Sequence, residues 1–401
     1  MDGFLTVGQP AAVAAVHAMV ASHVPHAILL SGPASVGKLA LAEDLAAALL
    51  CTGAEGGDRP CRACRACRML AHGNHPDLHL LEPEGPGGQV LIGGNERKDG
   101  KRGVRDLVTE LALLPVEGVA RVAIVRDAHR MNDDAQTALL KTLEEPPSNT
   151  TLILCADDEE RLLPTVRSRC ARIRLGTVGP RDVELLLERR ELADAPTAAR
   201  LARLAGGRAG LAVAYASAPE AEPIRNEITR TLLDLLTESP AARLRAAKPL
   251  LSRAVTLAGL LVPPPAGGAG AGAAEPKRRG RAANVAAVDE PDETAETAET
   301  ADEPAAKVSA SERRRALALL LDAWRDVARD LALGQLGASR SIRDVALLEE
   351  LEAAARDLPD GAAAEALARL VRASELLDSN VSPELVLDVL LIRWPRRRRV
   401  A

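Results

Sequence analysis

Aromatic side chains are almost absent from this sequence of 401 residues, in which Phe4, Tyr215, Trp324 and Trp394 are the complete set. Aliphatic side chains must therefore fill the core. Apolar residues make up 47% of the chain, which favours helices that pack through small and branched side chains. The length exceeds what one core normally serves, so we expect about two or three domains.

The sequence also has little net charge and no long apolar run. A formal net charge of −5 excludes a protein that coats nucleic acid, so any contact with DNA needs a local basic patch. No segment could span a bilayer, and the first residues lack the basic head and apolar core of a secretory signal. We expect a cytoplasmic protein without a membrane partner, in which clustered thiols bind metal rather than pair.

Short apolar runs alternate with helical patterns through the first 175 residues. This alternation predicts a parallel α/β sheet covered by helices on both faces. Helices are expected at 39–50 and 104–114, and after Gly176 only helical patterns follow, such as 181–190 and 198–205. The predicted strands are Ala27–Ser31, Leu78–Leu81, Val122–Val125, Thr151–Cys155 and Ala171–Leu175.

One segment, 263–309, has the composition of a disordered insert. It combines a proline run, Gly/Ala repeats, a basic knot at 277–281 and an acidic stretch at 289–303, and almost nothing in it could be buried. Its nine acids and five bases give it −4 of the total charge. Helical periodicity resumes at Glu312, so we interpret the insert as an interruption of one helical domain.

A phosphate-binding loop follows the first predicted strand. Residues 32–38 read G-P-A-S-V-G-K, in which Gly32 and Gly37 let backbone amides converge on phosphate and Lys38 reaches the outer phosphates. The residue after the lysine should be Ser or Thr, whose hydroxyl binds magnesium, but here it is Leu39. Two readings stay open: a nucleotide pocket with impaired metal binding, or a relic loop that binds nothing.

A second catalytic element is also missing. Asp127, at the end of the strand 122–125, is placed to hold magnesium through water, but the glutamate that should follow it and polarise the attacking water is Ala128. His129 comes next, and a single histidine after a strand is more often a satisfied surface residue than a replacement base. We therefore expect no ATP hydrolysis at this site.

Four of the six cysteines form a cluster with the spacing C-x9-C-x2-C-x2-C. Two-residue gaps let thiolates converge on one ion, and four sulfur ligands close a tetrahedral structural zinc site; an iron–sulfur cluster would use the same ligands. Four neighbouring arginines should lower the thiol pKa values. We interpret His72, His75 and His79 as bystanders, and Cys155 and Cys170 as packed side chains. The ligands are Cys51, Cys61, Cys64 and Cys67.

Several motifs resemble the clamp-loader subunits of bacterial DNA polymerase III, which belong to the AAA+ ATPases. The helix-like segment 133–147, Ser168-Arg169-Cys170, the opening Val7-Gly8-Gln9 and His26-Ala27 carry the resemblance over roughly residues 5 to 215, with a weaker match at 380–385. The two missing catalytic residues indicate a subunit other than the gamma/tau motor. The resemblance also favours zinc at the cysteines.

The resemblance gives Arg169 the role of an arginine finger, donated to ATP on a neighbouring subunit, where a permanently charged guanidinium stabilises the transferring phosphoryl group. The alternative is an ion pair within its own domain. Gly210 stands where the family has a sensor arginine in the lid, although Arg208 is close by.

The layout implied by the resemblance has three parts. An AAA+ P-loop domain (1–175, with a zinc module at about 51–75) precedes an all-α lid (176–220) and an all-α collar (221–262 and 310–401). The implied function is ATP-dependent loading of the sliding clamp onto primed DNA, beside gamma/tau and delta subunits, within the nucleotidyltransferase holoenzyme. ATP at the chain's own site is expected to be weak or absent.

Two rival functions and two ambiguous surfaces remain. The chain could itself be the ATP-hydrolysing gamma/tau motor, or its cysteine cluster could bind nucleic acid. The basic run 396–399 could contact DNA phosphates, but such tails are more often solvated. The apolar stripes of 317–333 and 384–392 suit either partner helices or an internal core.

Overall fold

The described part of the chain has an N-terminal parallel sheet and a C-terminal half made of helices. The computed structural model describes residues 3–53, 58–84, 88–93, 102–117, 120–261, 309–377 and 381–398. The predicted insert lies outside these residues except for Ser309, which caps the next helix. Asn380 and Arg399 lie outside them as well.

Five strands form one sheet in the order β2-β3-β4-β1-β5, and every described pairing is parallel. All five predicted strands are confirmed, with ends that shift by one residue at most. The carboxyl ends of the strands therefore share one edge of the sheet, and their amino ends share the other. The strands are β1 (Ala27–Ser31), β2 (Leu78–Leu81), β3 (Arg121–Val125), β4 (Thr150–Ala156) and β5 (Ala171–Arg174).

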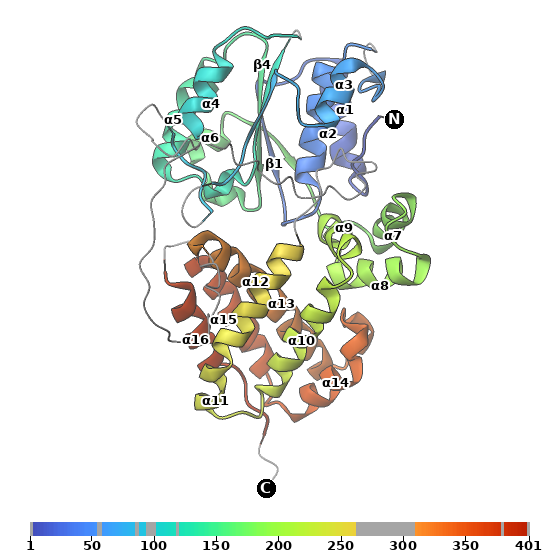
Figure 1. Ribbon diagram of the computed structural model, residues 1–401, viewed down its shortest axis with the longest axis vertical. Coiled ribbons are helices and arrows are strands. Elements are labelled where there is room, and N and C mark those ends of the chain that lie inside the picture. Colours follow the sequence, from blue (N-terminus) through green and yellow to red (C-terminus); the bar gives the residue numbers. More distant parts are fainter. Residues whose placement is uncertain are drawn as a thin grey trace, which may run out of the picture.

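Helices cover both faces of this sheet, as predicted (Figure 1). Alternate residues of each strand point to opposite faces, so Leu30 and Ile124 pack on one side while Leu29 and Val125 pack on the other. The first side carries α1 (Pro10–Ala21) and α2 (Lys38–Leu50), with α3 (Arg65–Ala71) against α2; the second carries α4 (Val104–Leu111), α5 (Asp133–Glu144) and α6 (Pro164–Arg167).

The predicted helix 104–114 ends early, at Leu111. Pro115 disfavours helical geometry in the residue before it, and the chain leaves the helix ahead of it. Leu113 and Leu114 are consequently 61% and 83% exposed. Buried Arg121 fixes this loop by donating to the carbonyl of Leu114.

From Val178 to Trp394 the buried apolar residues form one continuous core. In Figure 1 these helices lie below the sheet, with α7 to α9 beside α10. Helices α12 and α13, which flank the insert in sequence, pack directly against each other. The helices are α7 (Pro180–Arg189), α8 (Ala195–Ala205), α9 (Ala209–Ser217), α10 (Ala221–Asp234), α11 (Pro240–Arg245), α12 (Ala247–Leu260), α13 (Ala310–Gln335), α14 (Leu348–Asp357), α15 (Ala362–Leu377) and α16 (Pro383–Ile392).

The start of α13 is a capping box. The Ser309 hydroxyl accepts from the amide of Glu312, and the Glu312 carboxylate accepts from the amide of Ser309. These two hydrogen bonds satisfy backbone donors that a helix start leaves free. Ser309 therefore belongs to the helix, and α13 begins at Ala310, two residues before the predicted restart.

The C-terminal segment is tied into the helical core by side chains that also bind backbone. Trp394 packs edge-on against Trp324, with ring centroids 5.2 Å apart, and its indole donates to the carbonyl of Leu232. Buried Arg243 donates to the carbonyls of Trp394 and Pro395. Beyond them, two arginines of the basic run pair with acids: Arg397 with Asp357 and Arg398 with Asp360.

A buried ion network joins α9 and α10 to α13. Arg208, before α9, lies 3.2 Å from Asp322 and 3.3 Å from Asp326. Arg225 of α10, 3% exposed, lies 2.7 Å from Asp344 and 3.6 Å from Asp326. Because the charges are desolvated, each needs its partner.

We predict that Asp344→Ala destabilises the helical half by about 3 kcal/mol, because it leaves Arg225 buried with only the longer Asp326 contact. Unfolding in urea can be followed by tryptophan fluorescence, since both tryptophans lie in this core. Glu350→Ala is the matched control, because it breaks the exposed Arg230–Glu350 pair and should cost less than about 1 kcal/mol. Equal effects of the two substitutions would contradict the prediction.

Candidate functional site

The phosphate loop lies between β1 and α2, at the carboxyl edge of the sheet. Gly32 and Gly37 have φ of 146° and 106°, backbone conformations that favour glycine. At Gly32 an added Cβ would lie 2.1 Å from the carbonyl oxygen of Leu175, so a side chain has no room there. Leu39 packs against the aliphatic core on the α2 side of the sheet, where its side chain offers no ligand for magnesium.

The ammonium group of Lys38, in the phosphate loop, makes its contacts with other groups of the same chain. Lys38 is 7% exposed, and its ammonium donates to the carbonyls of Gly32 at 2.7 Å and Pro33 at 2.6 Å. It also lies 2.7 Å from a carboxylate oxygen of Asp157, at the end of β4. Three contacts match the three N–H donors of an ammonium group.

Asp127 follows β3 with a positive φ of 51° and is brought next to Asp157 and His129. Ligand atoms of these three residues lie within 4.8 Å of one another. The interpretation of His129 as a surface residue is wrong, because the side chain is 7% exposed. Burial lowers its pKa, and the neutral ring accepts a hydrogen bond at Nδ1 from the amide of Asp157.

The start of α9 contacts the phosphate loop through its backbone. The amide of Gly210 donates to the carbonyl of Ser35 at 2.8 Å, and a Cβ on Gly210 would lie 3.1 Å from that oxygen. Arg208, the other residue considered for the sensor position, binds Asp322 and Asp326 on α13. Gln9 joins the same region, because its amide nitrogen donates to the carbonyls of Val36 and Gly176.

Arg169 lies at the opposite edge of the sheet. It lies two residues before β5, and β5 runs parallel to β1, so one strand length of roughly 16 Å separates it from the loop after β1. Its guanidinium donates to the carboxylate of Glu144 at 2.6 Å and to the carbonyl of Thr165. The ion pair within its own domain is therefore present, and Arg169 cannot reach the phosphate loop of its own chain.

A glutamine that the sequence reasoning missed fixes the segment before Arg169. Gln136 of α5 is 1% exposed; it donates to the carbonyls of Met131 and Arg161 and accepts from the amide of Leu163. All three contacts are to backbone, so the side chain joins α5 to the approach to α6. Gln136 lies at a buried position within the 133–147 motif, and its place in that motif was the signal that could have identified it.

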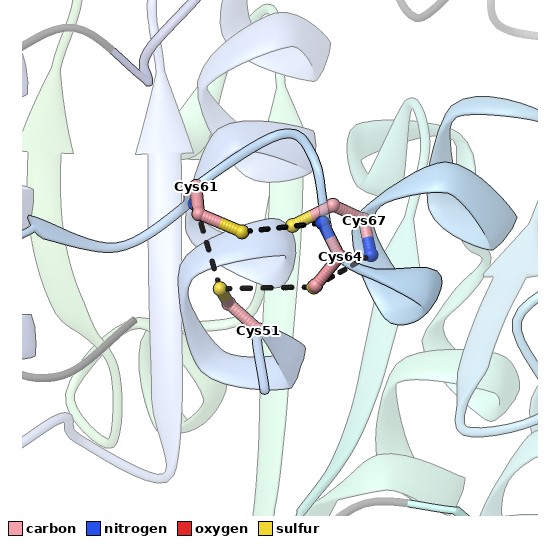
Figure 2. Close-up of side chains that lie close together, drawn as sticks. All are labelled: Cys51, Cys61, Cys64 and Cys67. Atoms are coloured by element: carbon pink, nitrogen blue, oxygen red, sulfur yellow. Dashed lines mark hydrogen bonds between the residues drawn. The ribbon is translucent and has the colours of Figure 1, made fainter. Parts of the chain in front are cut away.

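The four clustered cysteines converge, as Figure 2 shows. Their sulfur atoms lie within 4.8 Å of one another, and the sulfurs of Cys51 and Cys64 are 4.0 Å apart. A tetrahedral zinc ion with Zn–S bonds of about 2.3 Å requires sulfur separations of about 3.8 Å. The four thiols therefore fit one such ion, with no ligand position left for a substrate.

Backbone amides donate to three of these sulfurs, whereas burial raises the pKa of the fourth, Cys67. Amides of Cys61, Cys64 and Cys67 donate to the sulfurs of Cys51, Cys61 and Cys64 respectively. Although burial opposes the shift, hydrogen bonds from Cys67 and Thr52 lower the pKa of Cys64 to about 5. Hydrogen bonds from the amides of Ala63 and Cys64 lower the pKa of Cys61.

The expected electrostatic role of the neighbouring arginines is not what the structure shows. Arg62 binds the carbonyl of Gly3 and the buried carboxylate of Asp44, Arg65 binds Glu117, and Arg68 binds the carbonyl of Ala63. Arg62 and Arg65 are paired with carboxylates and Arg68 binds a carbonyl, and amide hydrogen bonds are the main cause of the lowered pKa values of Cys61 and Cys64.

Asp44 of α2 anchors the cysteine loop to the rest of the domain. This carboxylate is 1% exposed; it accepts from the amides of Leu5 and Thr6 and from the Thr6 hydroxyl, in addition to binding Arg62. One buried charge thus holds the N-terminal segment, α2 and the cysteine loop together, fully satisfied by hydrogen bonds.

The remaining thiols and histidines stand apart from the cluster. Burial raises the pKa of Cys155 to about 12 and that of Cys170 to about 11, as expected for packed thiols. His75 accepts from the amide of Asp77, and His79 pairs with Glu110. Neither histidine belongs to the cysteine group.

A phosphate loop after β1, an inner strand of a parallel sheet, with Asp127 after β3 on the far side of β4, defines the N-terminal part as a P-loop domain. Residues 8–178 match the family model described as "DNA polymerase III, delta subunit". Over 152 residues the chain is 41% identical to the DNA polymerase III subunit delta' of Pseudomonas aeruginosa, covering 37% of this chain and 42% of that protein. The resemblance to clamp-loader subunits of DNA polymerase III that the motifs indicated is therefore confirmed, and this part of the chain is similar to delta' subunits.

Other relatives match stretches of similar length. The delta' subunit of Bacillus subtilis is 34% identical over 159 residues, covering 40% of this chain and 44% of that protein. The gamma/tau subunit of Mycobacterium tuberculosis is 33% identical over 174 residues, covering 43% and 28%. The matched part spans less than half the length of each of these relatives.

We predict about one zinc ion per purified chain, because four converging thiols satisfy one tetrahedral ion. Cys64→Ser should abolish most of the bound metal, measured by elemental analysis. Cys170→Ser is the control, since Cys170 lies outside the cluster and should keep the metal. Wild-type protein without metal, or equal loss in both variants, would contradict the site.

Proposed function

We propose that this chain is the delta-prime subunit of a clamp loader, acting beside gamma/tau and delta subunits to load the sliding clamp onto primed DNA. The observation that carries this proposal is the separation of Arg169 from the chain's own phosphate loop. A guanidinium at the amino edge of the sheet can serve only a nucleotide held by another chain. The delta' relatives and the two missing catalytic residues support the same role.

In this proposal the parts of the chain have distinct tasks. The P-loop domain presents Arg169, and the cysteine cluster with zinc stabilises the module at about 51–75 without taking part in chemistry. Helices α7 to α9 serve as the lid, and α10 to α16 as a collar that contacts other subunits. The collar has surface for this, since Leu385, Val389 and Ile392 of α16 are 58%, 47% and 48% exposed, while Leu387 and Leu391 of the same helix are buried.

Glu144 positions Arg169 for its proposed role as an arginine finger. Its side chain is 52% exposed, so the pair it forms with Arg169 is accessible and weak enough to exchange, typically worth less than about 1 kcal/mol. A phosphate group, with more charge and several acceptor oxygens, competes well for a guanidinium held this way. Glu144 would thus keep Arg169 in place until the neighbouring nucleotide binds it.

Arg169→Ala is expected to leave the subunit folded and to lower ATP turnover of the reconstituted loader at least tenfold, because arginine fingers contribute large factors to phosphoryl transfer. Arg172→Ala, which removes an exposed arginine on the adjacent strand, should have little effect. Glu144→Ala should retain most of the turnover. If it lowered turnover as much as Arg169→Ala, the ion pair itself would explain the phenotype and the finger assignment would fail.

The alternative is an ATP-hydrolysing gamma/tau subunit, which the gamma/tau relatives keep open. Against it stand Leu39 and Ala128, since neither side chain can bind metal or polarise water. We predict that the isolated chain releases no phosphate above background and that Lys38→Ala changes nothing in this assay. Turnover by the isolated chain that Lys38→Ala abolishes would establish the alternative.

A further inference from the structure

Lys38 and Asp157 form an internal ion pair at the place where a phosphate loop binds phosphate. The Nζ–Oδ1 distance is 2.7 Å, and the lysine side chain is 7% exposed, against 33% for the aspartate. With the carbonyls of Gly32 and Pro33, this carboxylate uses all of the lysine's donors. A nucleotide phosphate would have to displace at least one of these contacts.

Asp157 is held in this position by the strand and by His129. It directly follows β4, whose last five residues, 152–156, pair with the whole of β1. Its amide donates to His129 Nδ1 at 3.1 Å, and buried His129 fixes the backbone there. The carboxylate is thereby placed beside the end of β1, where it contacts Lys38 of the phosphate loop.

The surroundings of Asp157 are unfavourable for a nucleotide. Asp127 lies beside it, with ligand atoms of both residues and of His129 within 4.8 Å. Two carboxylates next to the lysine would repel the negative charge of a phosphate, and Leu39 supplies no hydroxyl for the magnesium that would otherwise bridge acids and phosphates. The residues present therefore do not fit Mg-ATP.

The loop is also engaged from the side of α9. Ser35 has a positive φ of 61° and accepts the amide of Gly210, and Gln9 binds the carbonyl of Val36. The Gly210 contact joins the loop backbone to the helical part, whereas the Gln9 contact lies within the P-loop domain.

We propose that Asp157 is an internal substitute for phosphate, whose carboxylate neutralises Lys38, closes the loop to nucleotide and makes the loop a fixed structural joint. The proposal concerns binding at the chain's own loop. It stands or falls separately from the action of Arg169 on a neighbouring subunit.

The test is binding of fluorescently labelled ADP to the full-length chain, with and without magnesium, in wild-type protein and in Asp157→Asn. Removing the carboxylate's charge frees the lysine for phosphate, so the variant should bind ADP at least tenfold more tightly than wild type. The affinity gained should fall with rising salt and disappear in the double variant Lys38→Met/Asp157→Asn.

Asp158→Asn is the matched control, because it removes the same charge from the next residue, which caps the short helix 159–161 instead. It should bind ADP no better than wild type. Equal affinity of wild type and Asp157→Asn would overturn the proposal, as would an equal gain in Asp158→Asn.

A second measurement covers the case in which Asp157→Asn unfolds. Thermal unfolding of Lys38→Met, Asp157→Asn and the double variant forms a double-mutant cycle. The midpoint of the double variant should fall by clearly less than the sum of the single shifts, since removing both partners leaves neither charge unpaired. Additive shifts of the unfolding midpoint would show that the two side chains do not interact, and would contradict the ion pair on which the proposal rests.

Discussion

The parallel direction of the five strands is the constraint on which the rest of the structure depends. It gathers Lys38, Asp127 and Asp157 at the carboxyl edge of the sheet, and places Arg169 with Glu144 at the amino edge. The two groups are separated by a closely packed layer of aliphatic residues. The loss of catalytic residues at one edge therefore leaves the side chains at the other edge in place.

Much of the sheet could be predicted from the sequence because its signals are local. Buried parallel strands appear as short runs such as 27–31 and 151–155, and the phosphate loop is recognised within seven residues. The spacing of the cysteines sufficed to predict their convergence, since three of them lie within seven residues of one another. Where the local signal was incomplete, as in the helix that ends at Leu111, the proline four residues later was overlooked.

Contacts between segments far apart in sequence could not be predicted. Nothing near Lys38 indicates that Asp157, 119 positions later, would supply its counter-ion, because the pairing depends on β4 lying next to β1. The same holds for Asp44, whose partners come from the N-terminus and the cysteine loop, and for Arg208, which the sequence placed near the nucleotide but which binds α13. The charge of the arginines around the cysteines also led to a wrong expectation about the thiol pKa values, because these side chains have partners of their own.

In the helical half, too, the sequence pattern predicts the helices but not their packing partners. Apolar periodicity identified α13 and α16 as amphipathic but could not say which of their faces an internal core would use. The structure buries Leu387 and Leu391 and leaves Leu385 and Val389 exposed, because the neighbouring helices α11 and α15 contact one side of α16. Such choices are set by packing among many helices, each contributing a few side chains.

Helix α2 connects the phosphate loop and the cysteine cluster directly, since it begins at Lys38 and ends at Leu50, one residue before Cys51. A helix carries partial positive charge at its first turn and partial negative charge at its last. The first turn therefore favours an anion nearby, and the last turn favours a cation. The direction of α2 thus favours the acidic side chain of Asp157 beside Lys38 in its first turn, and it favours the metal cation of the proposed zinc site beyond its last turn.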